Sequence, residues 1–158
     1  MAFTANDVKK LRDATGAGLL DCKKALNETD GDVAAAEKLL KEKGLASMAN
    51  RTDRAAGEGR IVIKQDGNRY AIVEVLCETD FVANNTDFVE TAQKVAEATL
   101  SKKTSGVLDE HKAVIEDILV KFRENISVKR AEYIEVQPGY VCSTYVHHDN
   151  KIGSLVVL

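Results

Sequence analysis

The spacing of apolar residues changes along the chain, and this change limits the fold more than any other feature. Residues 1–45 repeat their apolar positions at helical spacing, with glycine-containing breaks that divide them into three short helices. Thr4 is expected to cap the first helix, and Gly44 to end the third. Residues 46–60 show little periodicity and predict a linker. The sequence therefore predicts an amino-terminal three-helix module joined by a linker to a second domain.

Residues 61–158 predict an α+β domain. Two strand-like segments flank Asp66-Gly67, which is a strong hairpin-turn signal. A pair of helices follows, the first capped by Thr86 and the second over Leu108–Phe122. Three more strands are expected, over Ile126–Val136, Tyr140–His147 and Ile152–Leu158. This order predicts an antiparallel-sheet core with a helical hairpin packed on one face.

The charge and composition indicate a folded soluble protein rather than a disordered or membrane-spanning one. The chain has 158 residues, with 22 Lys and Arg against 25 Asp and Glu, and a formal net charge of −3. With 44% hydrophobic and 30% charged residues, the composition is typical of a folded soluble protein rather than a disordered chain. Neither a run of about 18 apolar residues nor a basic-apolar leader is visible. We therefore expect no membrane partner and a cytoplasmic location.

The chain has three cysteines and three histidines, which are Cys22, Cys77, Cys142, His111, His147 and His148. The cysteines are widely separated and form no CxxC pair, so we expect small buried side chains rather than disulfides or a zinc site. The histidines lack metal-ligand spacing, and exposed positions at strand ends are expected for them. No metal site and no cofactor are predicted.

One segment departs from the regular pattern. Residues 77–85 predict a loop between a strand and a helix that exposes the ring of Phe81. The structural alternative is that Phe81 caps the core and Asp80 turns the chain. Six acids surround this loop in sequence, against the single Lys94: Glu74, Glu78, Asp80, Asp87, Glu90 and Glu97. Such a surface is expected to repel nucleic-acid phosphates and to attract a basic or metal-bearing partner.

Two motifs resemble a known family. The amino-terminal one is Leu11-Arg12, Gly16-Ala17-Gly18, Asp21-Cys22-Lys23-Lys24-Ala25-Leu26 and Asp30-Gly31-Asp32. It resembles the ubiquitin-associated-like module of bacterial elongation factor Ts. The central motif, Thr79-Asp80-Phe81-Val82-Ala83, resembles the central signature of that family. The likeness extends through Ile152-Gly153-Ser154-Leu155-Val156 and covers essentially the whole chain.

This resemblance implies a guanine-nucleotide exchange factor for the GTPase elongation factor Tu, which acts by binding and has no catalytic residue. It implies that the first module docks on the nucleotide-binding domain of the GTPase, through Leu11, Arg12, Gly16, Ala17, Gly18 and Leu19. It also implies that a second group of residues inserts beside the Mg²⁺ site of the partner: Asp80, Phe81, Val82 and Ala83. Direct contact with nucleic acid is not expected.

Two departures from the family pattern accompany these matches. Members commonly have a basic residue where this chain has Asn84, which puts electrostatic help from that position in doubt. Most members also continue into a second core half, whereas this chain ends on Leu155–Leu158. We therefore expect either a short form or one part of a longer protein. An unpaired apolar edge in this position favours a homodimer.

Two other functions are open to the sequence. An adaptor would bind a partner helix through Gly16–Leu20, with the second domain as scaffold. An enzyme would use Cys77 as nucleophile and His111 or His147 as base, but the sequence brings no such pair together and shows no orienting group.

Overall fold

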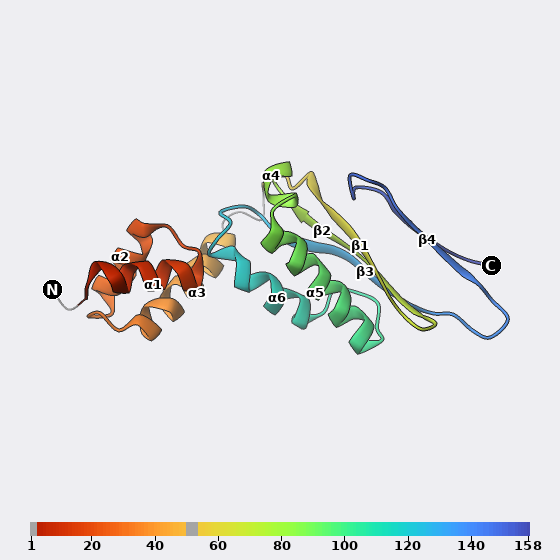
Figure 1. Ribbon diagram of the computed structural model, residues 1–158, viewed down its shortest axis with the longest axis horizontal. Helices are drawn as coiled ribbons and strands as arrows, with labels where there is room; N and C mark the ends of the chain where they lie inside the picture. Colours follow the sequence, from red (N-terminus) through yellow and green to blue (C-terminus); the bar gives the residue numbers. More distant parts are fainter. Residues whose placement is uncertain (1–2, 50–53) are drawn as a thin grey trace. The chain divides into compact units, whose positions relative to one another are not determined.

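The computed structural model describes residues 3–49 and 54–158. Contacts divide the chain into two compact units. The helical unit comprises Met1–Asp53 with Glu116–Glu124, and the sheet unit comprises Arg54–Ile115 with Asn125–Leu158. The architecture is mixed α+β, as predicted: helices precede the first two antiparallel strands, and further helices come between the second and third strands (Figure 1).

Three helices form most of the helical unit: α1 over Ala5–Thr15, α2 over Leu19–Glu28 and α3 over Val33–Ala49. The predicted cap at Thr4 is confirmed. The Thr4 hydroxyl accepts the Asp7 N–H at 3.3 Å, and the Asp7 carboxylate accepts the Thr4 N–H at 2.8 Å. These reciprocal bonds satisfy two donors that the first turn of a helix leaves open.

The predicted end of the third helix at Gly44 is wrong. Helix α3 continues through Gly44 to Ala49, because this glycine is a close-packing position rather than a cap. A Cβ atom added there would lie 3.2 Å from a methyl carbon of Val120. The predicted linker, residues 46–60, thus overlaps α3 at one end, and its residues 50–53 lie outside the described part of the chain. The domain boundaries remain a prediction.

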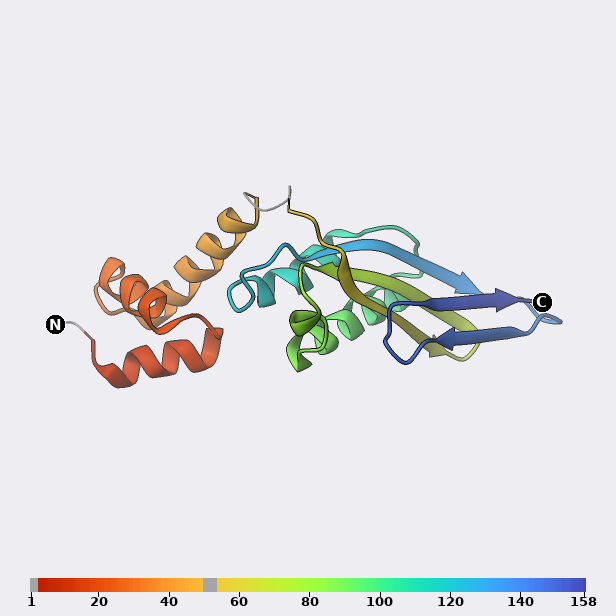
Figure 2. The same cartoon turned by 90° about the horizontal axis from the view of Figure 1, so that it is seen from above.

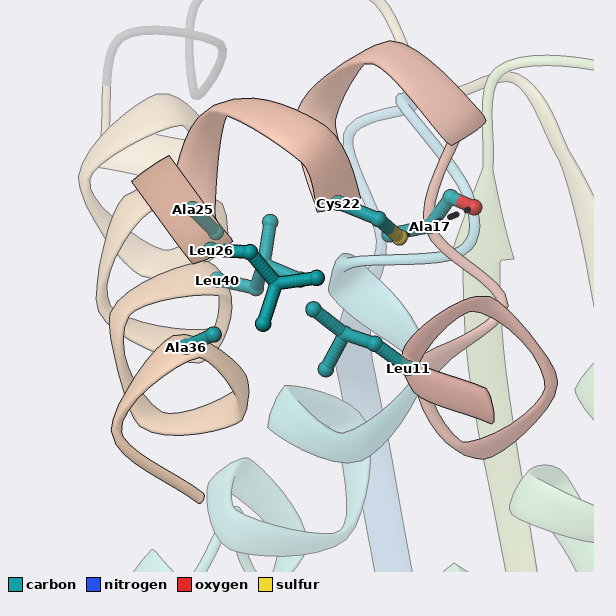
Figure 3. Close-up of a cluster of buried hydrophobic side chains, with 7 residues drawn as sticks. All are labelled: Leu11, Ala17, Cys22, Ala25, Leu26, Ala36 and Leu40. Carbon is teal, nitrogen blue, oxygen red and sulfur yellow. Dashed lines mark hydrogen bonds between the residues drawn. The ribbon is translucent and has the colours of Figure 1, made fainter. Parts of the chain in front are cut away.

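A small apolar core holds the helical unit together (Figure 3). Its buried members come from α1, α2, α3 and the turn before α2: Leu11, Ala17, Cys22, Ala25, Leu26, Ala36 and Leu40. The Cys22 thiol points toward the Ala17 carbonyl oxygen, at 3.8 Å. Val120 packs against this cluster, and Lys41 forms an ion pair with Asp117 at 2.8 Å. The carboxy-terminal segment of the unit therefore completes its core.

The strands of the sheet unit form two antiparallel sheets rather than the single sheet expected. The larger sheet has the order β1-β2-β3, over Glu58–Asp66, Arg69–Cys77 and Ser127–Glu135. The smaller sheet is the hairpin of β4, Cys142–Val146, and β5, Gly153–Val157. The hairpin lies beside β1, where the Ile61 N–H donates to the Asn150 carbonyl at 2.7 Å (Figures 1 and 2).

The β1-β2 hairpin is confirmed, with a small shift of its turn. Asp66 pairs with Arg69, so the two central residues are Gly67 and Asn68 rather than Asp66 and Gly67. Gly67 has φ +61°, a left-handed conformation that glycine adopts without steric cost.

Three helices accompany the sheets: α4 over Asp80–Ala83, α5 over Thr86–Lys102 and α6 over Asp109–Leu119. Asn85, not Thr86, caps α5, because its side-chain oxygen accepts the Asp87 N–H at 3.0 Å. Helix α5 packs across the β1-β2-β3 sheet (Figure 2). Phe88 of α5 is fully buried, as are Val73 and Val75 of the central strand. The core of the sheet unit thus lies between α5 and β2.

Candidate protein-binding sites

The segment after β2 forms a short helix rather than the expected loop. Helix α4 spans four residues, and the Thr79 hydroxyl accepts the Val82 N–H at 3.4 Å at its start. The ring of Phe81 is 83% exposed, whereas Val82 and Ala83 on the same turn are buried. The predicted exposure of this aromatic is therefore confirmed. The alternative, in which Phe81 caps the core, is wrong.

Side-chain hydrogen bonds to backbone carbonyl groups stabilise the position of helix α4. The guanidinium of Arg60, in β1, donates to the Ala83 carbonyl at 3.1 Å. The Asn84 amide donates to the Asp80 carbonyl at 2.9 Å, so this side chain folds back onto the helix. Sequence reasoning missed Arg60. Alternation along β1 could have placed it on the helix-bearing face, but no sequence signal pairs it with Ala83.

The acids near Phe81 do not form the continuous acidic surface that was expected. Glu74 accepts from Arg130 at 2.7 Å, and Glu97 forms an ion pair with Lys64. Glu78 accepts the Asn125 N–H at 2.7 Å, and its carboxylate also lies 3.6 Å from the Arg54 guanidinium. Basic side chains from other strands and loops therefore neutralise part of the charge of three of the six acidic residues.

A lysine from the β4-β5 turn contributes to the charge around α4. Lys151 forms an ion pair with Glu58 at 2.6 Å, and this carboxylate is the main cause of a raised Lys151 pKa. The charges of Asp149 and Asp80 raise the pKa of Lys151 further. Lys151 therefore remains a cation close enough to Asp80 to balance part of its charge. The sequence does not reveal this approach, because nothing local places the β4-β5 turn beside β1.

A second candidate surface lies in the helical unit, at the turn between α1 and α2. Gly16 ends α1 with φ +68°, and its N–H donates to the Arg12 carbonyl at 2.7 Å. A left-handed C-cap of this kind favours glycine. Four of the residues predicted for this surface are exposed: Arg12, Gly16, Gly18 and Leu19, the last 53% exposed.

Two residues predicted for this surface lie beneath it. Leu11 and Ala17 are 0% and 3% exposed, so they support the turn from the core and offer no contact area. Leu20, which belongs to the adaptor surface Gly16–Leu20 but not to the docking set that the resemblance implies, is 75% exposed. Its helical spacing resembles that of a core position, so only the fold separates it from its buried neighbours.

Comparison with known proteins identifies the family. The sequence model of one family, described as "Elongation factor TS", matches residues 78–158, about half of the chain. The chain belongs to the elongation factor Ts family. Three curated relatives named "Elongation factor Ts" support this. The Treponema denticola protein is 43% identical over the whole chain, and those of Idiomarina loihiensis and Clostridium perfringens are 42% and 43% identical over 100% and 99% of it.

The chain spans about half the length of these curated relatives, because the matched region covers 56%, 56% and 55% of them. The region matched by the elongation factor Ts family begins at Glu78 and therefore includes α4 with Phe81. The relatives also match the helical unit, since their alignments extend over essentially the whole chain.

The enzyme alternative named Cys77, His111 and His147, and the first two of these side chains are buried. His111 was expected to be exposed, but its side chain is fully buried, and its two ring nitrogens contact Thr99 Oγ1 and the Leu108 N–H at 3.0 and 3.1 Å. The Cys77 thiol is buried and donates to the Thr79 carbonyl at 3.2 Å. Cys22 is also buried, as predicted, whereas Cys142 is only partly buried.

Within residues 3–49 and 54–158, no cluster of three or more His, Cys, Asp or Glu side chains could hold a metal ion. In the same part of the chain, no helix combines the length and the apolar character needed to cross a membrane.

Proposed function

We propose that this protein is a guanine-nucleotide exchange factor that binds GDP-bound elongation factor Tu and promotes GDP release during translation elongation. The observation that carries the proposal is the exposed ring of Phe81 on α4, in a chain of the elongation factor Ts family. An aromatic that is 83% exposed on a fastened helical turn is available for insertion into a partner. This activity places the protein in the cytoplasm, with the translation machinery.

The mechanism uses binding energy rather than covalent chemistry. Mg²⁺ holds the phosphates of a bound nucleotide through near-octahedral geometry that tolerates little displacement. A ring inserted beside that site, with Asp80 next to it, disturbs the geometry. Burial of a phenylalanine side chain is worth roughly 1.5–3 kcal/mol. Each ~1.4 kcal/mol of coupling weakens nucleotide binding about tenfold, and bound nucleotide weakens the exchange factor equally.

The residues of α4 divide between two tasks in this proposal. Asp80 and Phe81 enter the partner, and the buried Val82 and Ala83 anchor the turn on the sheet unit. Because this mechanism acts by binding alone, it requires no acid, base or nucleophile from the chain and no cofactor.

The helical unit supplies a separate docking surface in the same proposal. Arg12, Gly16, Gly18 and Leu19 contact the nucleotide-binding domain of the partner, and Leu11 and Ala17 hold this turn in shape from the core. Leu20 joins the contact surface because of its exposure. A cation and adjacent exposed leucines suit a helical surface on a protein better than they suit nucleic acid, which needs several cations.

We also propose that two copies of the chain associate through the β4-β5 hairpin. Its strands are paired only with each other among the described strands, and Tyr145, Val156 and Val157 are 40–54% exposed. Exposed apolar side chains on a short sheet favour association. Sedimentation at increasing concentration is expected to show a dimer. A monomer throughout would remove this part of the proposal.

Release of labelled GDP from elongation factor Tu tests the exchange activity. The folded chain is expected to accelerate release, and Phe81→Ala to lose most of the acceleration while circular dichroism stays unchanged. Tyr140→Ala, which removes another exposed aromatic outside α4, is the matched control and is expected to retain the activity. Failure of the folded chain to accelerate release would refute the proposal.

The adaptor alternative is not favoured, because the matching relatives are named elongation factors. The same assay separates the two functions. An adaptor would bind its partner through the helical unit without any change in the rate of GDP release.

A further inference from the structure

The carbonyl end of α4 is closed by donors from three different residues. The Asp80 carbonyl accepts the backbone and side-chain N–H groups of Asn84, at 3.0 and 2.9 Å. The Val82 carbonyl accepts the Asn85 N–H at 3.0 Å. The Ala83 carbonyl accepts the Arg60 guanidinium at 3.1 Å, and this is the only one of these bonds that comes from outside residues 79–85.

Arg60 is placed for this contact by the strand that carries it. It pairs with Val75, which is fully buried, so both side chains lie on the face of the sheet that bears the helices. The preceding residue, Gly59, allows close approach of the two strands, because a Cβ atom there would lie 2.2 Å from the Val75 carbonyl oxygen. The Arg60 side chain is partly buried and spans from β1 to α4.

One such hydrogen bond contributes a large share of the stability of a helix of four residues. A single helical turn is unstable by itself, because its few internal bonds do not offset the ordering of the backbone. A cationic donor makes a shorter and stronger hydrogen bond than a neutral one, and it suits the negative end of a helix. The exposed ring of Phe81 makes little contact of its own, so its place depends on this backbone.

We propose that Arg60 is a positioning residue, which fixes α4 on β1 and thereby holds the ring of Phe81 in the orientation needed for insertion. The effect on nucleotide release rests on the proposed function, whereas the effect on α4 does not. Arg60 itself does not contact the nucleotide. It acts through the Ala83 carbonyl.

Amide hydrogen exchange in the isolated chain tests the local part of the inference. Arg60→Met keeps much of the side-chain length and removes the donors, and Arg60→Lys restores a cationic donor. Arg69→Met is the control, because Arg69 is an arginine of the same hairpin that pairs with Asp66 near the opposite end. The Ala83 and Asn84 amides, which bond to Thr79 and Asp80, report on α4.

Arg60→Met is expected to speed exchange of these two amides about tenfold or more, as expected for loss of a bond from a charged donor. The buried part of α5 is expected to stay protected. Arg60→Lys restores most of the protection, and Arg69→Met leaves both amides unchanged. Unchanged exchange in Arg60→Met would overturn the inference. So would equal acceleration throughout α5, which would mean a general structural role.

The kinetics of GDP release from elongation factor Tu test the link to function. Arg60→Met is expected to lower the maximal rate of release about tenfold, with less than a twofold change in the half-saturating concentration, because contacts outside α4 remain. Arg60→Lys restores most of the rate. A rise in the half-saturating concentration alone would overturn the positioning role. If the unchanged chain gives no acceleration, the proposed function fails, and hydrogen exchange still decides the role of Arg60.

Discussion

His111 Nε2 lies 3.0 Å from Thr99 Oγ1, and both side chains are fully buried where α6 meets α5. His111 Nδ1 accepts the Leu108 N–H at 3.1 Å, so the proton of the neutral ring resides on Nε2. The ring then donates to the Thr99 hydroxyl, which donates in turn to the Val95 carbonyl at 3.0 Å. This chain of bonds joins the two helices and requires an uncharged histidine.

Acid is therefore expected to weaken the sheet unit through His111. Burial lowers the His111 pKa below its ordinary value of 6.5, and the Glu110 charge opposes this shift. As the pH falls below 6.5, the His111 ring of the unfolded chain binds a proton, whereas the buried ring of the folded chain stays neutral. The free energy of unfolding thus falls with falling pH, by at most about 1.4 kcal/mol per unit from this group.

Denaturant unfolding at pH 7 and pH 5 checks this expectation. His111→Gln removes the contribution of this ring, so its stability should depend less on pH. His148→Gln, at an exposed histidine, should keep the full dependence. An identical pH dependence in His111→Gln and the unchanged chain would contradict a neutral buried ring.

Two phenylalanines seven positions apart should differ strongly in how much stability they lose on truncation. Phe88→Ala leaves a cavity under α5 and is expected to lower the free energy of unfolding by about 3–5 kcal/mol. Phe81→Ala is expected to change it by less than about 0.5 kcal/mol, because the ring is 83% exposed. Guanidinium unfolding followed by far-ultraviolet circular dichroism measures both. A large loss in Phe81→Ala would mean that the ring packs on the protein.

Gly59 and Gly57 differ in the space that is available for a Cβ atom. A Cβ atom at Gly59 would lie 2.2 Å from the Val75 carbonyl oxygen, and φ at this residue is +149°. Gly59→Ala is expected to destabilise the sheet unit by about 1–3 kcal/mol or more, because β1 must move away from β2. Gly57, which has no neighbouring atom within 4 Å of such a Cβ, is the control. Thermal unfolding of the two alanine variants should therefore separate, and equal midpoints would contradict the close strand approach.

The capping box of α1 gives a prediction for the helical unit. Thr4→Ala removes the acceptor for the Asp7 N–H and is expected to cost about 1 kcal/mol. Thr4→Ser keeps a hydroxyl and should keep most of the stability. Hydrogen exchange of the α1 amides is the suitable measurement, since it reports on this unit alone. Equal protection in the alanine and serine variants would show that the cap contributes nothing.

The features that the sequence predicts correctly depend on neighbouring residues. The Thr4 cap, the β1-β2 hairpin and the exposure of Phe81 each follow from a few consecutive positions. Gly44 shows the limit of such reasoning. A glycine near the end of a helical repeat predicts a stop, yet contact with Val120, far along the chain, makes it a packing residue inside α3.

The parts of the candidate site that the sequence does not predict arise between distant segments. Arg60 reaches Ala83 across 23 positions, and Lys151 forms an ion pair with Glu58 from a different hairpin. The division of the strands into two sheets has the same origin. Alternation of apolar and polar residues predicts a strand, but it does not predict which strand lies next to it. Burial of Leu11 beside the exposed Arg12 likewise needs the packed core to be seen.

The closed ends of α4 have an entropic consequence for any partner that receives Phe81. A loop of four residues that became ordered only on association would lose roughly 1–2 kcal/mol per residue in backbone freedom. Here the Thr79 hydroxyl, the Asn84 amide and the Arg60 guanidinium impose that order before any encounter. The ring is thus presented pre-organised, and nearly all of the free energy gained by burying it remains available to act on the partner.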